Sequence, residues 1–85
     1  MQEKLDELKK DLSEILQKKD IIVDEVIYVT EGKYNFLRIT LDKVNGIDLD
    51  TIVDATNIIN PIIDKYDFID EEFILDVISK EKGDF

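Results

Sequence analysis

Residues 21–42, IIVDEVIYVTEGKYNFLRITLD, constrain the fold of this chain more than any other segment. Two stretches rich in β-branched and aromatic residues flank the short sequence EGK, in which Gly32 can supply the positive φ of a tight turn. This pattern is typical of a β-hairpin. The chain is therefore expected to contain at least two antiparallel strands, and one face of this pair needs cover from the rest of the chain.

The two strands of this hairpin differ in how clearly they show a buried face. Leu37, Ile39 and Leu41 occupy alternate positions of the second strand, so they point to one side and are expected to face the core. The apolar residues of positions 21–23 and 26–28 are in opposite phases. Because a β-bulge reverses the side to which later residues point, we expect a bulge near Asp24 or Glu25.

An amphipathic helix is predicted before the hairpin, over residues 2–18. Its apolar residues recur at three- and four-residue intervals: Leu5, Leu8, Leu12, Ile15 and Leu16. Such a stripe in a small chain is expected to pack on the core, and a partner-binding helix face is the weaker alternative.

A second helix is predicted from residue 49 to about Tyr66. Asp48 is a good N-cap for it, because its carboxylate can accept a backbone N–H of the first turn. Pro61 lacks a helical N–H and clashes with the preceding turn, so a kink or a break is expected there, with Asn60 as a possible new cap. The face expected to be buried consists of Leu49, Ile52, Ala55, Thr56, Ile59 and Ile63.

The segment EEFILDVIS, at residues 71–79, is the third predicted strand, with Asp76 on its wetter face. The element order is then α-β-β-α-β, which indicates a two-layer α+β domain with two helices on one face of a three-stranded sheet. Because a helix connects the second and third strands, these strands are expected to be parallel. The pattern leaves the order of the strands open.

Acidic residues outnumber basic ones by 21 to 11, and the excess is concentrated in the second half of the chain. Between Val44 and Ser79 only Lys65 is basic, against nine acidic residues. This stretch would repel a phosphate backbone and attract basic protein, so direct contact with nucleic acid is not expected. The alternative is that the acidic residues bind no partner and only keep a small domain soluble.

The chain contains no cysteine and no histidine, which removes thiolate and imidazole ligands and the commonest general base. The oxygens of Asp42, Asn45, Asp48 and Asp50 suggest a calcium loop, but their spacing lacks the alternating carboxylates of an EF-hand. Acid–base work by Asp48 and Asp50 would need a pocket that separates their pKa values. No catalytic, cofactor-binding or metal site is therefore predicted, and the chain is not expected to be an enzyme.

The sequence predicts neither an export signal nor a membrane span. Residues 2–10, QEKLDELKK, lack the apolar centre of a signal peptide, and no apolar run approaches the roughly 18 residues of a span. We therefore expect a cytoplasmic protein with one domain at residues 1–79 and a polar tail at residues 80–85.

Three segments together resemble one known family: residues 23–32 (VDEVIYVTEG), residues 37–47 (LRITLDKVNGI) and residues 49–56 (LDTIVDAT). They resemble the N-terminal domain of the bacterial ribosome maturation factor RimP, over most of the chain from about Leu5 to Val77. RimP proteins continue after the third strand into a Ser-Ser-Pro-Gly segment and a barrel-like C-terminal domain. Here ISKEKGDF stands at residues 78–85, and no such second domain is expected. The chain is then expected to be either a truncated N-terminal domain or a stand-alone relative of RimP.

The resemblance implies a non-catalytic accessory role in maturation of the small ribosomal subunit. It also implies that the contact of RimP with a basic ribosomal protein lies largely in the C-terminal domain, so it supplies no contact residues for this chain. Charge and apolar exposure supply the candidate interaction surface instead: Asp50, Asp54, Asp64, Asp67, Asp70, Glu71, Glu72, Ile74 and Ile78.

Self-association is the alternative function. If the alternating aliphatic residues of the second strand face the helices, other apolar residues remain on the open face of the sheet. These are Ile74 and Ile78, with one of two pairs from the first strand, Val26 and Tyr28 or Ile27 and Val29. An uncovered patch of this kind is a credible surface for a homodimer.

Overall fold

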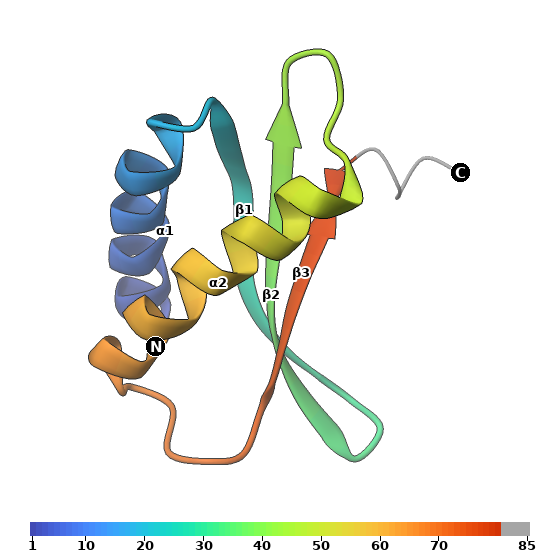
Figure 1. Ribbon diagram of the computed structural model, residues 1–85. Coiled ribbons are helices and arrows are strands. Elements are labelled where there is room, and N and C mark those ends of the chain that lie inside the picture. Colours follow the sequence, from blue (N-terminus) through green and yellow to red (C-terminus); the bar gives the residue numbers. More distant parts are fainter. Residues whose placement is uncertain (81–85) are drawn as a thin grey trace.

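The computed structural model describes residues 1–80 of the chain. Its elements are α1 (Gln2–Gln17), β1 (Ile21–Glu31), β2 (Tyr34–Lys43), α2 (Leu49–Tyr66) and β3 (Ile74–Ser79). This order confirms the predicted α-β-β-α-β, α+β fold. Both helices lie on the same face of the sheet, with α2 crossing it diagonally (Figure 1). Of the predicted tail, residues 81–85 lie outside the described residues, so the division of the chain at residue 79 stays a prediction.

The sheet has the strand order β1-β2-β3, which places β2 in the centre. β1 and β2 are antiparallel, and a two-residue loop joins them between Glu31 and Tyr34. Gly32 has a φ of +63° at the first loop position, where type II′ hairpin turns favour glycine. β2 and β3 are parallel, as expected for strands that a helix connects.

The register of β1 against β2 shifts between Val23 and Glu25, which confirms the predicted bulge and makes Asp24 the extra residue. Ile21 and Val23 lie before the shift and Val26 lies after it, yet all three side chains are buried. The bulge therefore allows apolar residues from both phases of β1 to reach the same core.

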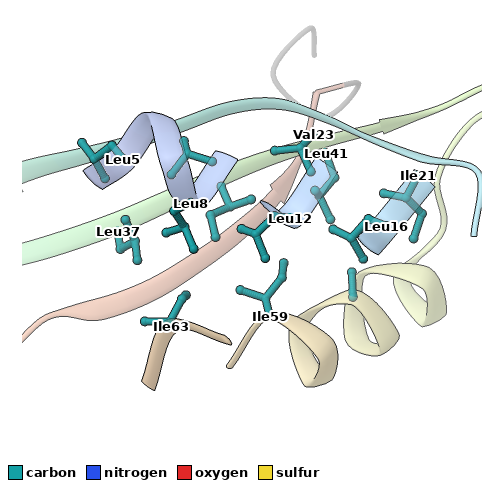
Figure 2. Close-up of a cluster of buried hydrophobic side chains, with 13 residues drawn as sticks. Leu5, Leu8, Leu12, Leu16, Ile21, Val23, Leu37, Leu41, Ile59 and Ile63 are labelled. Atoms are coloured by element: carbon teal, nitrogen blue, oxygen red, sulfur yellow. The ribbon is translucent and has the colours of Figure 1, made fainter. Parts of the chain in front are cut away.

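The core lies between the sheet and the two helices (Figure 2). Leu37, Ile39 and Leu41 of β2 are fully buried there, as predicted. In Figure 2 the leucines of α1 point toward the sheet, and Ile59 and Ile63 approach from α2. The complete set of buried apolar residues is Leu5, Leu8, Leu12, Leu16, Ile21, Val23, Val26, Leu37, Ile39, Leu41, Ala55, Ile59 and Ile63.

Two expectations for α2 are wrong. Leu49 was expected to be buried but is 67% exposed. It is the first residue of α2, and side chains of a helix point toward its N-terminus, so Leu49 lies before the part of α2 that covers the sheet. The helix is also continuous from Leu49 to Tyr66, so Asn60 does not begin a new one. Because proline has no N–H, Pro61 donates no hydrogen bond to the Asn57 carbonyl. Pro61 is exposed, so water can hydrate this carbonyl instead. A bend at Pro61 stays a prediction.

Asp48 caps α2 as predicted. Its backbone is extended, and its Oδ1 accepts hydrogen bonds from Thr51 N at 2.8 Å and from Thr51 Oγ1 at 2.7 Å. These hydrogen bonds, led by the one from the hydroxyl group, favour the charged carboxylate and lower the pKa of Asp48.

Replacing this cap should weaken the domain measurably. We expect Asp48→Ala to lower the melting temperature by about 5 °C at neutral pH, because the first turn of α2 loses its acceptor. Since the pKa of Asp48 is lowered in the folded state, its contribution is present above the unfolded-state pKa and disappears as the pH falls through the folded-state pKa. The difference between wild type and variant in thermal melts should therefore shrink at acid pH. Asp54→Ala is the control. A melting point that rises with calcium in wild type but not in Asp48→Ala would contradict the role of Asp48 as a cap.

A hydrogen bond joins the two helices near the end of α2, where the Tyr66 hydroxyl donates to the Asp11 carboxylate. This bond, with smaller contributions from burial and from the charges of Asp11 and Glu7, raises the pKa of Tyr66 to about 12. The neutral phenol is therefore favoured in the folded state.

Tyr66 should make the stability of the domain sensitive to alkaline pH. A raised pKa contributes stability that is present below the unfolded value of about 10 and is lost as the pH rises through the folded value. Urea denaturation should therefore show wild type to be more stable than Tyr66→Phe below about pH 10, with the difference declining toward about pH 12. A difference that is constant across this range would show that the bond to Asp11 does not control the titration.

Candidate interaction surfaces

The acidic residues predicted to form an interaction surface lie on α2 and on the segment that follows it. We call them the acidic surface: Asp50, Asp54, Asp64, Asp67, Asp70, Glu71 and Glu72. All seven are exposed. Three lie on α2 and four lie in the acidic loop, which we define as residues 67–73 between α2 and β3. The seven residues therefore come from one segment of the chain, residues 50–72.

Asp67 has a conformational role in addition to its charge. It is the C-cap of α2, with φ +45° and ψ +49°, and its N–H donates to the Ile63 carbonyl. Aspartate tolerates this left-handed conformation better than most residues do. Asp67 therefore has a reason to be present that is independent of any partner.

Two hydrogen bonds fix the acidic loop against the hairpin. The Tyr28 hydroxyl donates to Glu71 Oε1 at 2.9 Å, and Asn35 Nδ2 donates to the Glu72 carbonyl at 3.2 Å. Partial burial, with the hydrogen bond to Glu71 second, raises the pKa of Tyr28. The first pair between β2 and β3 is Phe36 and Ile74, so these side-chain contacts hold the loop where the β ladder has not yet begun.

A cleft of about 530 Å³ lies between the acidic loop and the start of β2. Tyr34 is one of its lining residues and has 60% of its surface exposed. The cleft combines apolar and charged residues: Lys33, Tyr34, Asn35, Glu71, Glu72, Phe73 and Ile74. Three of the predicted surface residues, Glu71, Glu72 and Ile74, thus share one concave site.

The open face of the sheet lies opposite the helices (Figure 1). Tyr28 and Val26 pack toward the core, so the apolar pair that β1 contributes to the open face is Ile27 and Val29. Ile74 and Ile78 of β3 belong to this face, and Ile74 is 45% exposed. The structure therefore resolves the alternative that the sequence left open.

A paired cation occupies the middle of this open face. Arg38 Nε donates to Asp76 Oδ2 at 2.8 Å, and Arg38 Nη2 lies 3.2 Å from Glu31 Oε1. The guanidinium group also lies 5.5 Å from the centre of the Phe36 ring. The hydrogen bond to Asp76 is the main reason that the pKa of Arg38 is raised. A partner on this face would therefore meet apolar side chains around one arginine that is paired with two carboxylates.

No group of three or more Asp, Glu, His or Cys side chains among residues 1–80 is placed to hold a metal ion. Of the helices in this part of the chain, neither is long and apolar enough to cross a membrane.

The family model of the RimP N-terminal domain matches residues 12–80. The chain belongs to the RimP N-terminal domain family.

Membership of the RimP family gives the chain a general role in ribosome maturation, in a family that is associated with the small subunit and is non-catalytic. The match spans the hairpin, α2 and β3, and it therefore includes every residue of the acidic surface and of the cleft. Most of α1 lies before the matched segment. The features that this RimP domain could use to bind a partner thus belong to the part of the chain that the family model covers.

Sequence reasoning missed Tyr34 and Asn35 as members of a candidate site. They are separated from Glu71 and Glu72 by more than 30 residues, and only the strand register brings the two segments together. An aromatic residue directly after a hairpin turn was the one signal that could have indicated Tyr34.

The predicted surface residues do not form one patch on this RimP domain. Ile74 and Ile78 point to the open face, whereas α2 with its carboxylates covers the opposite face of the sheet (Figure 1). The two regions meet at the cleft, where Ile74 lies beside the acidic loop.

Proposed function

We propose that this chain is an accessory factor in maturation of the small ribosomal subunit and that it binds a basic ribosomal protein through its acidic surface. The observation that carries this proposal is the exposure of all seven carboxylates on α2 and the acidic loop, two segments that contain one basic residue, Lys65. A surface of one sign attracts and orients a partner of opposite charge. The predicted cytoplasmic location and lack of catalysis agree with the family role.

The same charge disfavours ribosomal RNA as the direct partner. RNA binding normally uses lysine and arginine to neutralise phosphates, and the acidic surface would add repulsion instead. Within a subunit that contains both RNA and protein, the acidic surface therefore favours the basic protein component.

Co-sedimentation with immature small subunits tests this proposal. The chain should bind at low salt and dissociate as salt rises, because ions screen contacts between exposed charges. A variant with Asp54→Asn, Asp64→Asn, Asp70→Asn and Glu72→Gln should bind more weakly. A matched control removes four charges from the exposed side of α1, with Glu3→Gln, Asp6→Asn, Glu7→Gln and Glu14→Gln. Equal loss in both variants would show that only net charge matters and would contradict a defined acidic surface.

Self-association through the open face is the second candidate function. The observation that favours it is that Ile74 is 45% exposed on a sheet face that neither helix covers. Sedimentation at two protein concentrations should then show a dimer that dissociates on dilution, and Ile74→Lys should prevent its formation. A monomer at both concentrations, with Ile74→Lys unchanged in stability, would remove this candidate.

A further inference from the structure

We propose that the cleft between the acidic loop and the start of β2 binds one arginine side chain of a basic protein partner. This inference rests on the proposed function, since it names one contact within the binding of a basic protein. It differs from a general attraction between opposite charges because it requires a particular side chain in a particular place.

The shape of the cleft suits a long side chain with an apolar stem. Tyr34, Phe73 and Ile74 supply apolar wall, and the volume of about 530 Å³ leaves room for a side chain and part of its backbone. Arginine and lysine bury their methylene groups along such surfaces while the charged end stays in contact with water or with a carboxylate.

The charges at the cleft favour a cation. Two acidic residues, Glu71 and Glu72, line it, against one basic residue, Lys33. Glu71 Oε1 accepts the Tyr28 hydroxyl, but a carboxylate has about four acceptor positions, so Glu71 can still bind a guanidinium group. The cleft therefore carries an excess of negative charge beside apolar surface.

The exposed aromatic ring favours arginine over lysine. Tyr34 has 60% of its surface exposed at the edge of the cleft. A guanidinium group is planar, so it stacks on aromatic rings and forms paired hydrogen bonds with carboxylates. An ammonium group is not planar and does neither of these well.

The cleft is held in place before any partner arrives. The hydrogen bonds of Tyr28 to Glu71 and of Asn35 to Glu72 tie the acidic loop to both strands of the hairpin. Binding then costs little ordering of the loop, which increases the affinity that a single side chain can reach.

An NMR titration with N-acetyl-arginine amide tests the cleft directly. The amide signals of Asn35, Glu72 and Ile74 should shift and reach saturation. N-acetyl-citrulline amide has nearly the same shape without the charge, and it should bind at least about fivefold more weakly. Glu72→Gln and Tyr34→Ser should each weaken arginine binding, and Lys33→Gln should strengthen it. Glu14→Gln, a matched charge change on the exposed side of α1 and outside the cleft, should leave it unchanged. Thermal melts of each variant confirm that it is folded.

Three results would overturn the arginine site: no saturable shifts, equal binding of arginine and citrulline derivatives, or shifts that spread evenly along α2 instead of gathering at the cleft. Co-sedimentation with immature small subunits separates this failure from failure of the proposed function. Salt-dependent subunit binding without an arginine site would leave the proposed function standing. Saturable arginine binding at the cleft without subunit binding would support the site and contradict the ribosomal partner.

Discussion

Leu41→Ala should unfold a large fraction of this domain at physiological temperature. Leu41 is fully buried in the central strand, between β1 and β3 and beneath the helices. Removing most of its side chain leaves a cavity that costs about 2–5 kcal/mol. A domain of this size with one thin core has a total stability of only about 5 kcal/mol, so a loss at the upper end of this range removes nearly all of it. Urea denaturation followed by circular dichroism measures the change.

Ile74→Ala is the matched control for Leu41→Ala. It also shortens an aliphatic side chain of the sheet, but on the open face, where 45% of the Ile74 surface is exposed. It should cost much less than the core substitution, since less apolar surface is lost from the folded state. Equal costs at the two positions would show that the open face is as well covered as the core.

Pro61→Ala should stabilise the domain by about 1–3 kcal/mol. Pro61 lies inside a continuous helix and is exposed, so alanine there restores a hydrogen bond to the Asn57 carbonyl without touching the core. Asn57→Ala, an exposed substitution in the same helix that restores no hydrogen bond, is the control. A gain no larger than that of the control would show that α2 has already relaxed around the proline.

Local signals made several features predictable. The bulge followed from two apolar phases within residues 21–28, and the turn followed from Gly32, whose conformation few other residues adopt freely. Asp48 as a cap followed from one side chain and the N–H groups of the next turn. Each of these features depends on residues within a few positions of one another, where sequence patterns are most informative.

Features that depend on distant residues were not predictable from the pattern. The exposure of Leu49 depends on where α2 first lies over the sheet, and the continuity of the helix at Pro61 depends on packing by Ile59 and Ile63 on either side of it. The cleft needs the register of β3 against β2. The acidic residues could be read from the sequence, but the sequence did not show that Tyr34 and Asn35 lie beside them.

One binding experiment tests most directly whether the acidic surface recognises basic protein. It compares two samples, immature small subunits and the protein-free RNA extracted from them. We predict that the chain co-sediments with the subunits at low salt and is released at high salt. We also predict that it does not bind the protein-free RNA under either condition. Equal binding to the stripped RNA would show that RNA is the partner and would contradict the proposed function.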